Sequence, residues 1–258
     1  MDAVLSAGGI PRPDELLYPY TQGKPKALLD IHGKPMIQWV LDALGAAHQV
    51  ERVVLIGLDE ASGVSCSKPI TYIPNQVTMI ENILGGIHKV MEINPSATQV
   101  LVVSSDIPGI TAEMVDWEVE KARQLDVDIC YTVATRQVIE SRYPTSRRTF
   151  VKLKDGEVCG GDINVVHTSV AYRNTDIWVK LIETRKNPLK QAAILGIDTL
   201  LLILLHMLTL DQAVKRVTSR LHVTGRANIT PYAEMAMDVD KPHQLEMMRA
   251  DLAGRVGH

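Results

Sequence analysis

Aromatic side chains are scarce in this sequence, and it carries no excess of positive charge. Phenylalanine, tryptophan and tyrosine together make up 4% of the 258 residues, and Phe150 is the single phenylalanine. Surfaces that stack single-stranded bases need several aromatic rings, so this composition argues against one. The formal net charge of -3 also provides no basic surface for a polyanion. We therefore expect no nucleic acid partner.

Cysteine is also rare. The three cysteines, Cys66, Cys130 and Cys159, are odd in number, lie far apart and form no CxxC pair. This spacing indicates neither a disulfide framework nor a zinc site. Free thiols are typical of a reducing compartment. The first residues also lack the basic and then apolar pattern of a secretory signal. These absences favour a cytoplasmic location.

Long apolar runs are limited to one segment, residues 192–208. This run is short for a membrane span, contains Asp198 and is interrupted by Gly196. We therefore expect no transmembrane segment. The favoured interpretation is a helix buried in the fold or in the interface of a homodimer. The alternative is a helix that lies on a membrane surface.

The shorter apolar runs alternate with helical patterns in the first half of the chain. Strands are predicted at residues 2–5, 52–58, 70–73, 99–104 and 128–134. Helices are predicted at residues 36–44, 79–91 and 111–125, where apolar residues recur at helical spacing. This alternation is typical of an α/β domain with a mostly parallel, doubly wound sheet. A chain of this length can form such a fold as one domain, residues 1–258.

The pattern changes after residue 135. Two short apolar runs, 150–154 and 157–159, flank Asp155-Gly156, which predicts a hairpin. A strand at 163–168 and helices at 175–183, 188–208 and 211–221 are predicted to follow. Residues 150–231 are therefore interpreted as a substrate-side subdomain within the single domain. A last strand at 235–239 and a helix at 244–252 are predicted to rejoin the sheet.

The first predicted strand is followed directly by four small residues, Ser6, Ala7, Gly8 and Gly9. Small residues let a ligand approach the backbone, and consecutive N–H groups in such a loop can cradle phosphate oxygens. Three cations lie near this loop in the sequence, Arg12, Lys24 and Lys26, and Lys24 is the weakest candidate because it lies outside the KALL segment. The compact ammonium of Lys26 suits charge that develops on a phosphoryl group, and Arg12 could clamp phosphates. We expect this stretch to hold a nucleoside triphosphate, with Lys26 and Arg12 as catalytic cations.

Carboxylates come just after the strongest strand signal and at the end of the last predicted strand. Asp106 comes after residues 99–104, and ligands of open α/β sheets bind outside the carboxyl ends of strands. A carboxylate there can hold Mg2+ between phosphates. The alternative is that Asp106 caps the next helix, but Thr111 is better spaced for capping. Asp240 lies two residues before Pro242 and is expected to cap the last helix, so Asp238 is the predicted second metal ligand.

Several of these motifs together resemble one family. AVLSAGG, KPKALLDIHGKPMIQWVLDAL, VVSSDIPGITAEMVD and MAMDVDKPHQLEMMRADL are similar to nucleotidyltransferases of the sugar-nucleotide and molybdenum-cofactor type. The resemblance implies a three-layer α/β/α, Rossmann-like (GT-A type) fold. It also implies that the glycine loop contacts the nucleotide, that Lys26 stabilises the transferring phosphate and that Asp106 binds magnesium. The segment 75–86 resembles the part that reads the base, with Gln76 and Asn82 as its polar candidates.

The resemblance implies a Mg2+-dependent transfer of a nucleoside monophosphate from a triphosphate, CTP or GTP, to a phosphorylated small molecule. Gly161, Asp162 and Asn164 follow the predicted hairpin and could meet this acceptor; the alternative is a tight turn at the end of a strand. The sequence departs from the family at Ile10-Pro11-Arg12-Pro13, where Arg12 is one place out of register. That departure motivates the alternatives of a nucleotide-binding regulatory module or a sugar transferase on the same scaffold.

Overall fold

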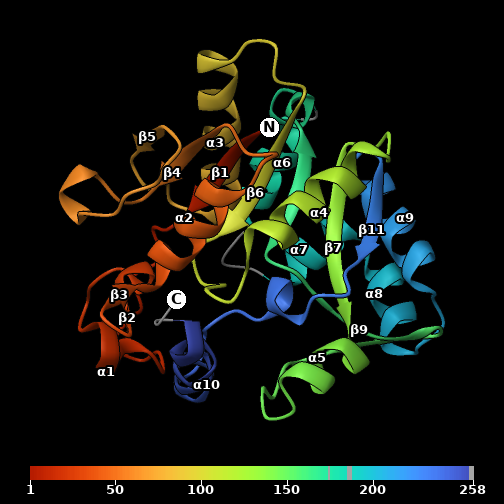
Figure 1. The fold of residues 1–258 in the computed structure, drawn as a ribbon. Coiled ribbons are helices and arrows are strands. Elements are labelled where there is room, and N and C mark those ends of the chain that lie inside the picture. The colour runs from red at the N-terminus through yellow and green to blue at the C-terminus, as the bar shows by residue number, and fades with distance from the viewer. Residues whose placement is uncertain (174, 185–187, 256–258) are drawn as a thin grey trace.

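The computed structural model describes residues 1–173, 175–184 and 188–255, and these build one large mixed sheet. The strand order is β5–β4–β1–β6–β10–β7–β9–β8, and β11 pairs with β7 (Figure 1). The strands are β1 (Asp2–Ser6), β4 (Arg52–Ile56), β5 (Ile70–Ile73), β6 (Gln99–Ser104), β7 (Ile129–Thr135), β8 (Val151–Leu153), β9 (Gly156–Gly160), β10 (Ile163–His167) and β11 (Gly225–Ile229). Among these strands, β9 and β10 run against the direction of the others. The predicted mostly parallel α/β sheet is confirmed.

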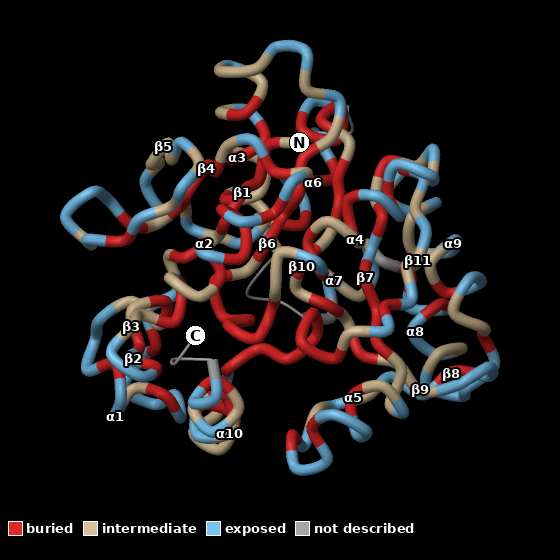
Figure 2. The backbone as a smooth tube through the Cα atoms, in the orientation of Figure 1, coloured by how far each residue is buried: buried red, intermediate tan, exposed pale blue. Residues whose placement is uncertain are grey.

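Side chains of the central strands alternate between two cores, because successive residues of a strand point to opposite faces. On β1, Ala3 and Leu5 belong to one core, and Val4 belongs to the other. Helices α2 (Met36–Ala46) and α4 (Ala112–Arg123) cover the first face. Helices α3 (Met79–Ile93) and α6 (Thr175–Glu183) cover the second. The buried strands lie between these helices (Figure 2), so the predicted three-layer arrangement is confirmed.

A third core joins the segment after β1 to the C-terminal segment and to residues between 134 and 159. The small ribbon of β2 (Asp30–Ile31) and β3 (Lys34–Pro35) and the short helix α1 (Tyr18–Thr21) lie beside α10 (Pro242–Leu252) in Figure 1. Ile31, Met36 and Leu245 are fully buried members of this core. This packing fixes the long loop after β1 against the last helix, near the edge where the glycines and the late aspartates lie.

Helix boundaries follow the capping residues of the sequence. The hydroxyls of Thr78 and Thr111 accept hydrogen bonds from Glu81 N and Met114 N, at the starts of α3 and α4. The prediction that Thr111 caps its helix is confirmed. Thr135 caps a further helix, α5 (Arg136–Arg142), in a polar stretch where the apolar pattern gave no helix signal.

Two predicted elements differ in the structure, and one strand was not predicted. Residues 188–208 do not form one helix, because Gly196 adopts φ +100° and separates α7 (Pro188–Leu195) from α8 (Ile197–Leu204). The predicted strand at 235–239 is a short 3-10 helix, η4 (Ala233–Ala236), followed by extended chain. The strand β11 was not predicted, since its sequence GRANI lacks an apolar run. Helix α9 (Leu210–Arg220) occupies the predicted position.

The strands β8, β9, β10 and β11 of residues 150–231 extend the central sheet. The described residues of 150–231 therefore share one sheet with the rest of the chain. Within the described ranges, no helix is both long and apolar enough to cross a bilayer. Helix α8 lies at the outer side of the molecule beside α9 (Figure 1), with Leu204 72% exposed.

Candidate functional site

The candidate site lies at the edge where β1 and β6 end. Ser6 and Ser104 are the last residues of these strands and pair in register. Strand β10 is antiparallel to β6, so its beginning lies at the same edge, and Asp162 just precedes it. Ser104 N donates to Asp162 O at 2.9 Å, and Ser105 N donates to Ser6 O at 3.1 Å. Three strand ends thus meet here, which is where ligands of open α/β sheets bind.

Lys26 and Asp106 meet at this edge. The Lys26 ammonium lies 2.5 Å from Asp106 Oδ2 and 2.7 Å from Asp240 Oδ1. Ser104 Oγ donates to Asp106 Oδ1 at 2.6 Å, so both carboxylate oxygens of Asp106 are bonded. Val239 N donates to Asp106 O at 2.9 Å, which anchors the late segment to the strand end. The long loop, β6 and the C-terminal segment therefore contribute charged groups to one point.

Asp238 belongs to the same cluster and forms an ion pair with Arg148. Carboxylate oxygens of Asp106, Asp238 and Asp240 all lie within 4.8 Å of one another. With Asp162, four carboxylates face the cations Lys26 and Arg148. Oxygen donors and an excess of negative charge fit a divalent cation of the magnesium type, which binds one or two protein carboxylates and substrate oxygens.

The cluster shifts the pKa values of two of its members. Burial by itself lowers the pKa of Lys26, but Asp106 and Asp240 outweigh it, so the pKa is raised and the ammonium stays charged. Burial and, after it, the Asp106 carboxylate together raise the pKa of Asp162 to about 7, although Arg148 opposes the rise. Asp162 is therefore the carboxyl of this edge whose protonation changes near neutral pH.

The two glycines of the first loop have different surroundings. A Cβ on Gly8 would stand 1.9 Å from Asn75 Oδ1, so the loop needs glycine there to pack against Asn75. Among the described residues, nothing lies within 4 Å of the Cβ position of Gly9. Gly9 lines a hollow of about 450 Å³ together with Lys26, Asp240 and Lys241. The backbone of Gly9 is therefore open to a ligand, whereas Gly8 packs closely against Asn75.

The polar residues of segment 75–86 hold their own loop together. Asn82 is buried, its Oδ1 accepts from Gln76 N at 2.7 Å and its Nδ2 donates to Asn75 Oδ1 at 3.0 Å. The Gln76 side chain donates to Pro74 O at 3.0 Å. Because Asn75 packs on Gly8, this network sets the position of the glycine loop.

Arg12 lies apart from the cluster. Its side chain is 71% exposed, and its Nε donates to Glu15 Oε1 at 2.9 Å. Described residues that line the hollow beside Gly9 include Glu15 and Asp14, whereas Arg12 is not one of them. Among the described residues, the cations that line the hollow are Lys26 and Lys241.

Gly161, Asp162 and Asn164 line a second cavity, which begins at Ser6 and Ser104 and continues between the helices that cover the sheet. A Cβ on Gly161 would stand 2.9 Å from Thr132 Cγ2, so the chain there runs close to β7. Asn164 Oδ1 accepts from Thr132 N at 2.9 Å, which fixes the amide at the cavity wall. The three predicted acceptor residues therefore share one cavity next to the acidic cluster.

A model of the MobA-like NTP transferase domain matches residues 4–223. The chain belongs to this NTP transferase family. The match covers both the glycine loop and the strand end that carries Asp106, and the chain is accordingly a nucleotidyltransferase that uses a nucleoside triphosphate. The resemblance drawn from the sequence motifs is confirmed.

Solved structures agree with this assignment. A hypothetical transferase from Thermus thermophilus is 30% identical, with a TM-score of 0.80 over 95% of this chain and 98% of that one. A CMP:2-keto-3-deoxy-manno-octonic acid synthetase complexed with CTP is 16% identical, with a TM-score of 0.63 over 98% of this chain and 99% of its own. At that identity the second similarity concerns the fold alone. Among curated proteins, no significant match is found.

Two charged residues of this NTP transferase were missed or misread in the sequence. Asp240 was expected to cap the last helix, but Lys241 is the N-cap residue, and the Asp240 side chain reaches Lys26 instead. Arg148 was not singled out, because it lies in a stretch rich in arginine and serine with no strand or glycine signal beside it. Only the approach of that stretch to the late segment brings Arg148 to Asp238.

Proposed function

We propose that this chain transfers a nucleoside monophosphate from a nucleoside triphosphate to a phosphorylated small molecule and releases pyrophosphate. The observation that carries the proposal is the meeting of Lys26, Asp106 and Asp240 beside the open backbone of Gly9. A cation, carboxylates and free backbone N–H groups at one strand edge are what a triphosphate requires.

The triphosphate occupies the hollow beside Gly9, and Ser6, Ala7 and Gly8 lead the chain from β1 to this hollow. Lys26 neutralises negative charge on the transferring phosphoryl group, and its raised pKa keeps it cationic. Lys241 lines the same hollow and supplies a second cation where Arg12 was expected. Arg12 then acts only after the loop rearranges, because Glu15 holds it in the present arrangement.

The acceptor lies in the adjacent cavity, against Gly161, Asp162 and Asn164. An oxygen of its phosphate forms a new bond to the α-phosphorus, and the bond from the α-phosphorus to the bridging oxygen of the β-phosphate breaks. Pyrophosphate leaves with that electron pair. A phosphate monoester is already ionised near neutral pH, so the step needs no general base. The chain accelerates the step by positioning the two phosphates and by neutralising their charge.

Asp106 and Asp238 are the residues that would hold Mg2+, and Asp240 is a third carboxylate within reach. Bound there, the metal would neutralise phosphate charge. Lys26 and Arg148 pair with these carboxylates in the structure, so each cation can turn toward a phosphate when the carboxylates are shared with a metal. CTP and GTP remain the favoured triphosphates, and a cytoplasmic location remains the expected one.

The test uses the full chain with each of CTP, GTP, UTP and ATP and with Mg2+. We expect one triphosphate to raise the melting temperature, because a ligand that binds the folded state stabilises it by mass action. With a panel of phosphate monoesters, the same triphosphate should release pyrophosphate. Asp106→Asn should abolish the metal-dependent part of the thermal shift.

Asp126→Asn is the matched control, since Asp126 is exposed and precedes β7 at the opposite edge of the sheet. Nucleotide binding that is equal in wild type and Asp106→Asn would contradict the proposal. Nucleotide binding without pyrophosphate release from any acceptor would favour a regulatory module.

A further inference from the structure

A cavity of about 360 Å³ opens from the candidate site and runs between α3, α6 and the sheet. Its walls are mainly apolar side chains from both helices and from β6 and β10: Ile80, Ile83, Leu84, Val102, Val166 and Trp178. The volume lies at the lower end of the range for small-molecule sites, about 300–1,000 Å³. Such a lining suits an apolar ligand group, since apolar cavities in proteins stay dry and take up apolar molecules.

The polar end of this cavity belongs to the candidate site. Ser104 lines the cavity and also donates to Asp106 at 2.6 Å. Asp162 lines it too, and its Oδ2 is buried without a hydrogen-bond partner among the described residues. A buried, unpaired carboxyl oxygen is costly unless a ligand bonds to it. The cavity therefore has one polar mouth at the reacting groups and an apolar interior.

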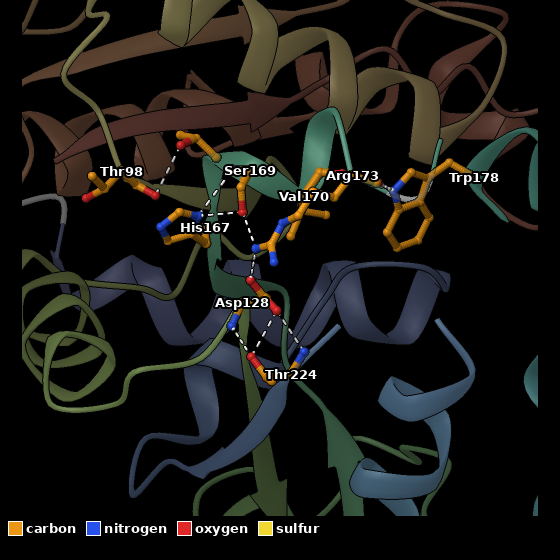
Figure 3. Close-up of polar contacts among 9 residues, drawn as sticks. Thr98, Asp128, His167, Ser169, Val170, Arg173, Trp178 and Thr224 are labelled. Atoms are coloured by element: carbon orange, nitrogen blue, oxygen red, sulfur yellow. Dashed lines mark hydrogen bonds and ion pairs between the residues drawn. The ribbon is translucent and has the colours of Figure 1, made fainter. Parts of the chain in front are cut away.

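The wall on the α6 side is fixed by a polar network at the far end of β10 (Figure 3). Trp178 Nε1 donates to the carbonyl oxygens of Val170 and Arg173, each at 3.0 Å. Arg173 forms an ion pair with Asp128, which also accepts from Thr224 N at 2.8 Å. The network joins the start of α6 to β7 and the turn before β11, so the Trp178 ring is held in place before any ligand binds.

We propose that the cavity holds an apolar moiety of the acceptor, so that the acceptor is a phosphate monoester of an apolar alcohol. This rests on the proposed function and narrows its acceptor class. The phosphate lies at the polar mouth beside Ser104, where the cations Lys26 and Arg148, which both act on Asp162, oppose its charge. The hydrocarbon part extends between α3 and α6. A polar sugar phosphate would leave the hydroxyls of its ring facing Ile83, Leu84 and Trp178 without hydrogen-bond partners.

The test is a series of acceptors that differ only in chain length: methyl, butyl and hexyl phosphate, with glycerol phosphate as the polar comparison. Pyrophosphate release is measured with the triphosphate that binds. Each methylene that enters the cavity is expected to raise kcat/KM by up to about fourfold. Binding of hexyl phosphate is measured separately by calorimetry without nucleotide, which gives a readout independent of turnover.

Ile83→Trp fills the cavity from α3 and should remove the preference for hexyl over methyl phosphate, both in kcat/KM and in binding. Val179→Trp is the control, because Val179 is 50% exposed on α6 and the same indole is added outside the cavity. The control should keep the hexyl preference of the wild type. Far-UV and near-UV circular dichroism verify that both variants are folded.

Equal use of methyl, hexyl and glycerol phosphate would overturn the proposal while leaving the transfer reaction intact. A preference for hexyl phosphate that survives Ile83→Trp would also overturn the proposal. Competition between hexyl phosphate and the triphosphate for binding would overturn it too, because the cavity would then belong to the nucleoside. If no triphosphate binds but hexyl phosphate binds in a manner that depends on Ile83, the transfer reaction fails and the apolar site is supported.

Discussion

At the residue scale, the arrangement around Lys26 decides what the site can do. Its ammonium bridges Asp106 and Asp240, which come from parts of the chain far apart in sequence. A lone loop lysine would be solvated and mobile, whereas two carboxylates hold this one at the strand edge. The same contacts keep it charged, which is the state required next to a phosphoryl group.

Lys26→Met should lower the rate of pyrophosphate release by about 100- to 1,000-fold, the loss typical when one preorganised electrostatic contact is removed. Binding of the triphosphate should weaken less than turnover, and a steady-state assay combined with calorimetry separates the two. Lys24→Met is the control, since Lys24 is exposed and lies two residues away. Equal losses in both variants would mean that only the general charge of the loop matters.

Glu118 is a second residue whose environment sets a measurable property. It is fully buried on α4, and its Oε2 accepts from Asn228 Nδ2 at 2.8 Å. Burial raises its pKa from the usual 4.5 to about 7. The folded state therefore holds the proton more tightly than the unfolded state, so this group's contribution to stability falls as pH rises from about 4.5 to about 7 and stays low above that.

Glu118→Gln removes this titration and keeps an acceptor for Asn228. Relative to wild type, the variant should gain up to about 3 kcal/mol of unfolding free energy between pH 4.5 and pH 8, measured by urea denaturation at both values. Glu120→Gln removes the same charge from the exposed side of α4 and serves as the control. A pH dependence that is the same in wild type and Glu118→Gln would disprove the buried, proton-holding state of Glu118.

At the scale of elements, the approach of α3 to β1 positions the helix that lines the apolar cavity. A Cβ on Gly86 would stand 2.3 Å from Val4 Cγ1, so the helix lies on the strand through a glycine. A Cβ on the neighbouring Gly85 would meet only Gln76 Cγ, at 3.9 Å, among the described residues. Gly86 therefore allows α3 to pack closely on β1, whereas Gly85 lies at an open position of the same helix.

Gly86→Ala should destabilise the protein by about 1–3 kcal/mol, because the added methyl overlaps a packed core. Gly85→Ala should stabilise it by up to about 1 kcal/mol, because alanine is the better helix former at an open position. Urea denaturation of the two variants measures both effects. Stabilisation by both substitutions would show that α3 does not pack on β1 as closely as described.

At the scale of the whole molecule, helix α8 leaves an apolar surface exposed. Leu200, Leu201 and Leu204 on this helix are 40%, 53% and 72% exposed, and Leu205 and Met207 continue the apolar surface. Exposed apolar patches of this kind mark interaction sites. The sequence predicts a homodimer through this segment, and that prediction is kept as a proposal.

We expect a dimer in sedimentation velocity at micromolar concentration and a monomer for the double variant Leu200→Ser, Leu204→Ser. Val77→Ser is the control, since Val77 is 72% exposed on the loop before α3. The double variant should keep the circular dichroism spectrum of the wild type. A monomeric wild type would rule out the dimer, and vesicle binding that is lost in the double variant would then favour the membrane-surface alternative.

Much of the fold could be predicted because strands such as β6 are continuous apolar runs, QVLVVS, and because Thr111 marks a helix start. The strand β11 could not, since GRANI becomes a strand only by pairing with β7. Helix α5 was missed because its polar sequence has no apolar period. The break at Gly196 was visible as a glycine in an apolar run, but a helix can accommodate one glycine at small cost.

The sequence alone determined the family, the α/β alternation and the place of Asp106 after a strand end, because each depends on local order along the chain. Only the tertiary structure decided that Asp240 reaches Lys26, that Arg148 meets Asp238 and that Arg12 turns to Glu15. Those contacts join segments whose approach depends on how the late chain packs against β6. Long-range packing leaves no periodic pattern in any one segment, so these contacts could not be predicted from a single stretch of sequence.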